Sequence, residues 1–514
     1  MRVEGLKTYF HTYEGIVRAL EGITFEVMKG ETMGLVGETG CGKSVTALSI
    51  MGLIPRPPGK IEAGEVYVRE PSRVTALRKD HDSRVALQKA GAREKLISDL
   101  ESKFEALSGP EHESEKAEIR DQLSALRHSC DVLRMSSAEL DSIRGARISM
   151  IFQEPMTALN PTMTIGNQIG ETIELHQLNE LIDVVLRQLK LERDALEKGK
   201  TGYRQRPDER PISGGEAPPS QARESSSGQR VCSECGNPVR DDWGACLSCG
   251  VALKSRSSSL LPTALRRLRL GLETRYYERM KENSDNTIAY FVRNTPVIRR
   301  LTQRRLKLAK LMRAEFALKD VKIAEPGRIA RSYPFELSGG MKQRAMIAMM
   351  MACRPDLLSA DEATTALDVT VEAQILGLMR ELKSARGTSI LLITHDLGII
   401  AENCQRVAVM YAGYIAELSA VRDIFLKPMH PYTNALLRSI PKIGPAHMRT
   451  RKQPLNVIPG VVPNLLTPPT GCRFHPRCDR MLEICRSEVP ELLEVHPGHF
   501  VACHNPVMAS KEAG

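Results

Sequence analysis

A glycine-rich octapeptide at residues 37–44 constrains the fold of this chain most strongly. Its spacing, G-x-x-x-x-G-K-[ST], is that of a phosphate-binding loop. Residues 31–36 before it predict a short buried strand, and residues 44–53 after it predict a helix. Glycines let backbone N–H groups turn toward phosphate oxygens at a helix N-terminus, whose dipole favours anions. The sequence therefore predicts an α/β nucleotide-binding domain with a phosphate-binding loop.

The octapeptide supplies the first set of candidate ligands for a nucleotide. Lys43 has the reach to contact the β- and γ-phosphates, and the Ser44 hydroxyl is a candidate ligand for Mg²⁺. The residues expected to contact the nucleotide here are Gly37, Glu38, Thr39, Gly40, Cys41, Gly42, Lys43 and Ser44.

A second segment supplies the acidic half of a phosphoryl-transfer site. The apolar run at residues 357–360 ends at Asp361 and Glu362. We expect Asp361 to hold Mg²⁺ and Glu362 to polarise the attacking water as a general base. A further buried strand over residues 389–394 precedes His395, which we expect to contact the γ-phosphate. The alternative for His395 is a structural role at a strand end.

Two more segments complete an ordered motif set. Gln153 follows a predicted strand over residues 148–152, and the sequence Leu-Ser-Gly-Gly at 337–340 opens a predicted helix. With Ala-Leu-Asp at 366–368, these segments and the three described above stand in the order found in ABC ATPases, and the chain resembles that family. Six ordered matches are far more specific than any one of them.

The resemblance implies a mechanism in which two nucleotide domains dimerise head to tail around ATP. The signature of one domain, here Ser338 and Gly340, would close on ATP held by the phosphate loop of the other. Gln153 would sense the γ-phosphate or the metal and take part in Mg²⁺ binding. Because Glu362 and His395 are both present, we expect a hydrolysing site.

Other stretches resemble the ATP-binding subunits of oligopeptide/dipeptide importers. The resemblance covers about residues 1–68, 131–192 and 314–505. The stretches that carry it are residues 152–161, 165–171, 364–370, 409–413, 430–433 and 458–463. It implies ATP and Mg²⁺ as ligands, and an aromatic at Tyr9, Phe10 or Tyr13 stacked on adenine, with Phe10 the first choice.

The same resemblance implies the partners and the location. We expect a homologous ATPase subunit to complete the dimer, two membrane permease subunits to carry the solute, and an external solute-binding protein to deliver it. The chain would be peripheral, on the cytoplasmic face of the cell membrane. Two departures from the family pattern are Ala363, in place of the usual proline, and Ser359, which puts a hydroxyl into an otherwise apolar strand.

Four cysteines near the end of the chain, spaced C-x5-C-x6-C-x17-C, form one candidate metal site: Cys472, Cys478, Cys485 and Cys503. Four thiolates are the usual ligands of a 4Fe–4S cluster, which the resemblance favours. A four-cysteine zinc site is the chemical rival. Free structural thiols are the third alternative.

A second group of cysteines predicts a zinc ribbon. Two C-x2-C-G units stand ten residues apart, and their thiolates are Cys232, Cys235, Cys246 and Cys249. Such pairs suit tetrahedral Zn²⁺, and so small a module would depend on the metal for its folding. A disulfide pair fits poorly in a reducing compartment.

Two inserts, at about residues 70–130 and 193–313, interrupt the family pattern. Residues 70–130 predict an antiparallel helical hairpin, which either packs on itself in solvent or serves as a docking arm. Residues 254–313 hold 16 Lys/Arg and 4 Asp/Glu, a local net charge of +12, whereas the whole chain carries +10. For this basic segment the alternatives are a solvated helix face, anionic lipid headgroups and nucleic acid.

These patterns predict an ABC-type core with a helical subdomain, an inserted hairpin, an inserted zinc ribbon and a cysteine-containing extension. The chain has no apolar run of the roughly 18–20 residues that a membrane-spanning helix needs. The predicted domains are the first part of the core at 1–69, the hairpin at 70–130, the core and helical subdomain with the glutamine loop at 131–192, a disordered linker at 193–229, the zinc ribbon at 230–251, the basic helical insert at 252–313, the second part of the core at 314–425 and the C-terminal extension at 426–514.

The function predicted from the sequence is ATP hydrolysis that energises an importer of peptides or a related small solute. The main alternative is a nucleic-acid-handling ABC ATPase of the DNA-repair type, because some of those also carry zinc modules. The importer-like tail argues against nucleic acid as a partner. A third alternative is an ABC ATPase that remodels a partner protein.

Overall fold

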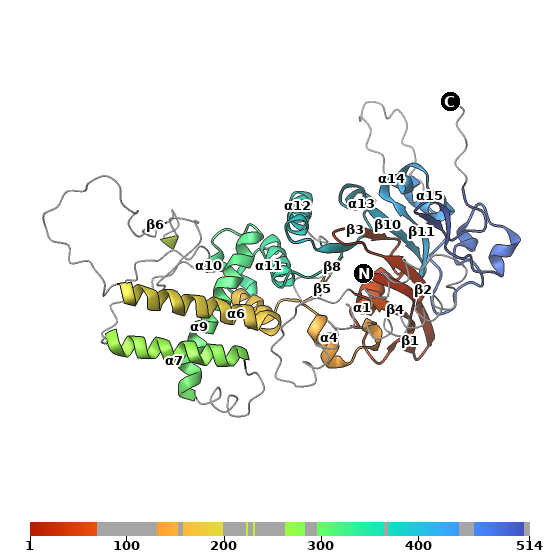
Figure 1. The fold of residues 1–514 in the computed structure, drawn as a ribbon. Coiled ribbons are helices and arrows are strands. Elements are labelled where there is room, and N and C mark those ends of the chain that lie inside the picture. Colours follow the sequence, from red (N-terminus) through yellow and green to blue (C-terminus); the bar gives the residue numbers. More distant parts are fainter. Residues whose placement is uncertain are drawn as a thin grey trace, which may run out of the picture. The chain divides into compact units, whose positions relative to one another are not determined.

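The structure is a computed structural model that describes residues 1–68, 131–152, 158–198, 223–224, 230–231, 263–282, 296–363, 368–440 and 457–507. It forms two compact units, of which the first holds the described residues up to 158 and from 354 onward. The second unit holds the described residues between 159 and 353. Figure 1 shows the elements in the colour order of the chain.

The first unit is built on a sheet of eight described strands in the order β12-β13-β11-β10-β3-β9-β8-β5. The five strands from β10 to β5 run parallel. Every residue of β3, β8 and β9 is buried, as is typical of parallel strands covered on both faces. The strands are β3 (Thr32–Val36), β5 (Ile148–Ile151), β8 (Leu357–Asp361), β9 (Ser389–Ile393), β10 (Arg406–Tyr411), β11 (Tyr414–Ala420), β12 (Leu493–His496) and β13 (His499–Val501).

A second, antiparallel sheet packs in the same unit. It has the order β2-β1-β4, with β1 at Arg2–Thr12, β2 at Gly15–Glu26 and β4 at Gly59–Tyr67. Leu6 and Leu20 of this sheet share one hydrophobic core with Leu35 of β3. The core therefore fixes the N-terminal sheet against the strand that leads into the phosphate loop.

Helices follow the strands of the first unit, and their caps set where each one starts. Asp396 accepts hydrogen bonds from the backbone N–H groups of Gly398 (2.6 Å) and Ile399 (3.3 Å), so a helix begins at Leu397, two residues after His395. Figure 1 shows α13, α14 and α15 beside β10 and β11. The helices are α1 (Lys43–Ile50), α4 (Ser137–Ile143), α12 (Val369–Arg386), α13 (Leu397–Asn403), α14 (Val421–Leu426) and α15 (Pro431–Arg438), with 3-10 turns η2 (Val132–Arg134), η5 (His475–Arg477) and η6 (Glu483–Arg486).

The second unit is mainly helical in its described part, with two short strands. Its longest helix, α6, packs against both α7 and α9, and it crosses the predicted domain boundary at residue 192. Leu181, Val185 and Leu189 of α6 are fully buried, which gives this helix an apolar face at helical spacing. The elements are α6 (Ile165–Lys198), α7 (Thr263–Glu282), α9 (Pro296–Asp320), α10 (Pro326–Ile329), η3 (Pro334–Glu336), α11 (Gly339–Met351) and the short strands β6 (Arg223–Glu224) and β7 (Arg230–Val231).

The described part of the basic segment lies on α7 and α9, and acidic side chains neutralise several of its cations. Arg305 of α9 lies 2.9 Å from Glu192 of α6 and 2.7 Å from Glu273 of α7. Its side chain is only 18% exposed, and through these two ion pairs it links α6, α7 and α9. Lys310 and Arg313 likewise pair with acids of α6. These pairs favour a structural use of the basic charge over an anionic partner.

Two predicted modules lie outside the described residues. The hairpin at 70–130 and the four ribbon cysteines at 232–249 belong to parts of the chain that the structure does not describe. None of the described helices has the length and apolar character that crossing a membrane requires.

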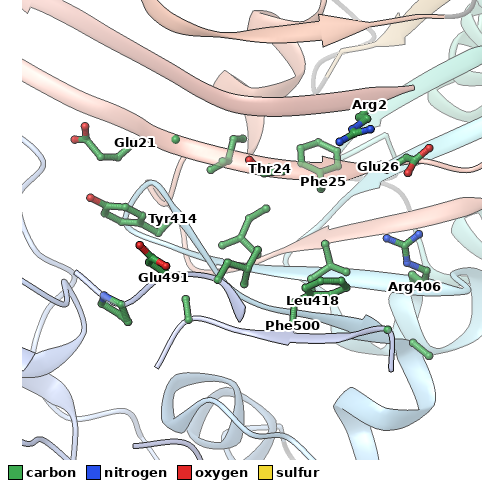
Figure 2. A pocket seen from close by; sticks show the side chains of 18 of the residues that line it. Arg2, Glu21, Thr24, Phe25, Glu26, Arg406, Tyr414, Leu418, Glu491 and Phe500 are labelled. Atoms are coloured by element: carbon green, nitrogen blue, oxygen red, sulfur yellow. The ribbon is translucent and has the colours of Figure 1, made fainter. Parts of the chain in front are cut away.

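A pocket of about 1100 Å³ lies in the first unit between β2, β11 and the tail around β13. Figure 2 shows Phe25, Leu418 and Phe500 among its apolar lining residues, with Arg2 and Arg406 near one end. None of its described lining residues belongs to the loop at 37–44, so the pocket is separate from the phosphate-binding site.

Candidate nucleotide site

The loop between β3 and α1 has the shape of a phosphate cradle, and glycine is required at two of its positions. A Cβ atom at Gly37 would lie 2.2 Å from the carbonyl oxygen of Met410. Gly42 has φ +106°, and a Cβ there would lie 2.8 Å from the Ala19 carbonyl oxygen. Thr39 and Gly40 are exposed at the tip of the loop, and Cys41 is buried. The predicted strand-loop-helix arrangement is therefore confirmed.

The Lys43 ammonium group is folded into the loop. Its Nζ donates hydrogen bonds to the carbonyl oxygens of Gly37 (2.8 Å) and Glu38 (3.2 Å), and the residue is buried. These carbonyl oxygens hold the ammonium group at the centre of the loop. A phosphate bound there would replace them as the hydrogen-bond acceptor of Lys43. The loop thus presents one fixed positive charge and several backbone N–H groups.

The carboxylate of Asp361 is suited to a divalent cation. It ends β8, is 4% exposed, and accepts a hydrogen bond from the Ser44 hydroxyl. Its Oδ1 atom is buried without a hydrogen-bond partner, and burial raises the pKa of this carboxyl group. A hydroxyl and an unpartnered carboxylate oxygen are ligands that Mg²⁺ prefers, so the two residues fit this ion.

Glu362 and His395 are in contact at the same edge of the sheet. The His395 Nδ1 atom lies 3.1 Å from Glu362 Oε1. Glu362 has φ +45°, and its backbone N–H donates to the Ile393 carbonyl oxygen at 2.9 Å, which locks β8 to β9 at this point. The histidine side chain is 63% exposed and the glutamate side chain 16%. The structure therefore brings together the two residues that the sequence placed after separate strands.

The second unit carries the signature segment. Ser338 is the N-cap of α11, and Ser338 and Gly339 are exposed while Gly340 is half-buried. An ion placed there would meet unpaired backbone N–H groups at the start of a thirteen-residue helix. Gln153 lies outside the described residues.

The three aromatic candidates for adenine differ in their surroundings. Phe10 of β1 is half-buried and faces Val17 and Gly59 across the sheet register. The Tyr9 hydroxyl donates to Glu21, and burial together with that hydrogen bond raises its pKa to about 12. Tyr13 lies fully exposed between β1 and β2.

A family profile described as "ABC transporter" matches residues 20–133 and 267–365, and one described as "Oligopeptide/dipeptide transporter, C-terminal region" matches residues 416–485. A probable peptide ABC transporter ATP-binding protein of Sinorhizobium fredii is 33% identical over 98% of this chain and 93% of its own length. The dipeptide transport ATP-binding protein DppD of Bacillus subtilis is 30% identical over 98% of this chain and 93% of its own length.

The chain belongs to the oligopeptide/dipeptide importer family of ABC ATP-binding subunits. It is an ATPase with the phosphate-binding-loop α/β fold of that family. The prediction of an ABC ATPase of this importer family is confirmed, and the DNA-repair alternative is not supported.

The C-terminal region of this importer-family ATPase contacts the phosphate loop directly, which the sequence did not predict. The Tyr432 hydroxyl accepts a hydrogen bond from the backbone N–H of Glu38 at 3.1 Å. Arg477 pairs with the Glu38 carboxylate through two hydrogen bonds of 2.8 and 3.2 Å. The sequence signal was weak: Tyr432 lies in the stretch at 430–433 that carries the resemblance, and Arg477 lies only within the wider family match at 416–485.

A buried histidine, His430, accepts a hydrogen bond from the backbone of Tyr432. His430 Nδ1 accepts the backbone N–H of Tyr432 at 3.0 Å, and the other side of the ring bonds the Ala502 backbone. Burial lowers the pKa of His430 to about 4, so the ring is neutral at pH 7. Next to it, the fully buried Glu417 carboxylate accepts the backbone N–H groups of Met429 (2.7 Å) and His430 (3.0 Å).

The four tail cysteines of the ATPase have backbone donors at their sulfur atoms. The Leu482 N–H donates to the sulfur of Cys485 at 3.4 Å, and the Asn505 N–H donates to that of Cys503 at 3.3 Å. Backbone N–H groups also bond the sulfurs of Cys472 and Cys478, while burial raises the pKa of both thiols. Within the described residues, however, no three Cys, His, Asp or Glu side chains are arranged to hold a metal ion.

Proposed function

We propose that this ATPase subunit binds MgATP and hydrolyses it to energise the uptake of oligopeptides, dipeptides or a related small solute. One observation carries the proposal. The phosphate loop follows β3, Asp361 and Glu362 follow β8, and His395 follows β9, and these three strands are neighbours in the parallel sheet. Ligands of such sheets bind at the carboxyl ends of the strands.

The residues at the carboxyl ends of these strands would have three tasks: binding phosphate, binding Mg²⁺ and activating water. Lys43 and the backbone N–H groups of the loop would bind the β- and γ-phosphates, and Ser44 and Asp361 would hold Mg²⁺. The metal, when bound, neutralises charge on the phosphate oxygens. Glu362 would orient the attacking water and take its proton, and His395 would keep the Glu362 carboxylate in position.

We propose the head-to-tail dimer as the state that hydrolyses ATP. The backbone N–H groups of exposed Ser338 and half-buried Gly340 stand at the start of α11, where they would bind a phosphate held by a second chain. Gln153 would contact the γ-phosphate or Mg²⁺ and report nucleotide binding to the permease. The partners would be a homologous ATPase subunit, two permease subunits and an external solute-binding protein, with this subunit peripheral on the cytoplasmic face.

Reconstitution tests this function. The subunit, its homologous partner and the two permeases would be placed in vesicles that enclose MgATP, with the solute-binding protein and a labelled peptide mixture outside. Peptide uptake that requires ATP and disappears when Lys43 is changed to Ala is expected. ATP hydrolysis without uptake of any peptide would overturn the assignment of the solute while leaving the ATPase intact.

For the adenine base, we propose Phe10 as the stacking residue. Its half-buried ring on β1 is held more rigidly than the exposed ring of Tyr13. Binding of a fluorescent ATP analogue to Phe10→Ala and Tyr13→Ala separates the two. A loss of affinity in Tyr13→Ala alone would replace Phe10 by Tyr13.

We also propose the two cysteine groups as metal sites. The N–H donors at the tail sulfurs suit thiolates, so Cys472, Cys478, Cys485 and Cys503 are proposed to hold a 4Fe–4S cluster under reducing, anaerobic conditions. For the ribbon, the proposal of Zn²⁺ at Cys232, Cys235, Cys246 and Cys249 rests on spacing. Iron, sulfide and zinc analysis of protein purified without oxygen, with Cys478→Ser and Cys246→Ser as matched variants, tests the two separately.

A further inference from the structure

Glu38 is the first variable residue of the phosphate loop, and the C-terminal region holds it at two points. Arg477 Nη1 lies 2.8 Å from Glu38 Oε2, and Arg477 Nη2 lies 3.2 Å from Oε1. The backbone N–H of the same glutamate donates to the Tyr432 hydroxyl. Side chain and backbone of one loop residue are therefore fixed by two residues about 400 positions later in the chain.

Arg477 is itself fully engaged. Its side chain is 5% exposed. Besides Glu38, its guanidinium group donates to the Pro459 carbonyl oxygen (2.9 Å), the Ile458 carbonyl oxygen (3.4 Å) and the Tyr411 hydroxyl (3.2 Å). With these contacts all five N–H groups of the guanidinium have an acceptor. A side chain held in this way has one orientation, and its two hydrogen bonds therefore fix the position of the Glu38 carboxylate as well.

Tyr432 is held with similar rigidity. It is fully buried, and its ring centroid lies 4.6 Å from that of Tyr411 and 5.4 Å from that of Phe474. Because Tyr411 ends β10 and Phe474 precedes Arg477 by three residues, these aromatic contacts connect the parallel sheet to the same tail segment. The hydroxyl that receives the Glu38 N–H is thus fixed in space.

Two physical effects connect Glu38 to nucleotide binding. Lys43 donates to the Glu38 carbonyl oxygen, so the position of Glu38 sets both the curvature of the loop and the place of its cation. In addition, the carboxylate of Glu38 would repel a triphosphate bound by the same loop unless a cation neutralised it. Arg477 supplies that cation. Because Arg477 also holds the loop in one conformation before ATP arrives, less conformational entropy is lost when ATP binds.

We propose that Arg477, with Tyr432, is a positioning residue of the nucleotide site: the C-terminal region holds the phosphate loop in its binding shape by clamping Glu38. The proposal rests on residues 37–44 being the phosphate-binding loop. It gives the C-terminal region of this subunit a direct part in ATP binding, in addition to any part in metal binding.

The test compares ATP binding and turnover in single and double variants. Arg477→Gln is expected to raise the ATP dissociation constant roughly tenfold or more, as the loss of a charge-assisted hydrogen bond predicts. Its kcat at saturating ATP should change much less, because Glu362 and His395 are untouched. Arg477→Lys should recover part of the affinity, since it keeps the charge and loses the two-point contact.

A double-mutant cycle separates the clamp from a general loss of structure. Glu38→Gln removes the repelling carboxylate, so Arg477→Gln combined with Glu38→Gln should bind ATP more tightly than Arg477→Gln alone. Arg486→Gln, an exposed tail arginine paired only loosely with Glu483 at 3.8 Å, is the matched control and should bind like the unmodified chain. Tyr432→Phe should weaken binding without adding charge.

Three results would each overturn the proposal. They are an unchanged dissociation constant in Arg477→Gln, strictly additive effects in the cycle, or an equal loss in Arg486→Gln. If the unmodified chain itself fails to bind MgATP, the assignment of the nucleotide site fails instead, so the two failures are distinguishable. Urea unfolding midpoints of all variants show whether the first unit remains folded.

Discussion

His395 Nδ1 and Glu362 Oε1 lie 3.1 Å apart, although the two residues follow different strands, β9 and β8. The contact exists because Asp361 pairs with Ile393 in register and the Glu362 N–H donates to the Ile393 carbonyl oxygen. Asp396, which follows the histidine, is the N-cap of α13, and this helix begins at Leu397. The sheet thus brings the Glu362 carboxylate and the His395 ring into contact, although they follow different strands.

This contact predicts that His395→Ala lowers kcat for ATP about 100-fold. The KM for ATP should change little, because the residues that bind the phosphates are intact. Steady-state ATPase assays measure both constants. His504→Ala is a control, since His504 Nε2 lies at the same 3.1 Å from an oxygen atom, the Glu488 carbonyl oxygen of the tail, and belongs to none of the proposed nucleotide-binding segments. A fall in kcat no larger than that of the control would contradict an orienting role.

The unpartnered oxygen of Asp361 predicts an unusual stability pattern. Asp361→Asn removes a buried charge, so the free protein should be at least as stable as the unmodified chain. MgATP at about 100 times its dissociation constant should stabilise the unmodified chain by about 2.7 kcal/mol, and this gain should be largely absent in the variant. Thermal melts with and without MgATP measure both effects. A variant with the full MgATP-dependent shift would show that Asp361 does not hold the ion.

His430 predicts how stability depends on pH. Its pKa in the folded protein is about 4, below the ordinary 6.5, so the unfolded chain takes up a proton that the folded one excludes as pH falls from 6.5 to 4. The neutral ring therefore makes its full contribution to the free energy of unfolding above pH 6.5. Acidification to pH 4 removes about 3 kcal/mol of that free energy at most. Urea unfolding at intervals across this window should show a shallower pH dependence in His430→Gln. An identical slope in both proteins would contradict the assignment.

Ser359 predicts a stabilising substitution. Its hydroxyl oxygen is buried in β8 without a hydrogen-bond partner, so Ser359→Ala should raise the free energy of unfolding by about 1 kcal/mol. Thr388 provides the contrast, because its buried hydroxyl donates to the Pro355 carbonyl oxygen at 2.8 Å. Thr388→Val should therefore lower stability by a similar amount. Denaturant unfolding compares the two, and a loss of stability in Ser359→Ala would be the opposite of what is expected.

The sequence predicted the parts of the site that depend on local order. A buried strand followed by glycines and a helix predicts a phosphate loop, and acidic or imidazole side chains directly after apolar strands predict the edge where they meet. The boundaries of β3, β5, β8 and β9 agree with those predictions within about two residues.

The sequence did not predict contacts that depend on distant segments. Glu38 and Arg477 are separated by 439 residues, and nothing local indicates that a tail arginine reaches the phosphate loop. For the basic segment the sequence left three alternatives open: a solvated helix face, anionic lipid headgroups and nucleic acid. In its described part, Arg305 pairs with Glu192 across 113 residues of sequence, a contact that charge composition does not indicate.

The central claim is that ATP closes this subunit onto a homologous partner and that Glu362 ends the closed state by activating water. Glu362→Gln, mixed with the partner subunit carrying the equivalent change and with MgATP, tests it most directly by light scattering and by analysis of the bound nucleotide. We predict a stable pair of ATPase subunits that retains unhydrolysed ATP, with turnover reduced at least about 100-fold. Separate subunits in saturating MgATP, or ATP hydrolysis at the unmodified rate, would contradict the account.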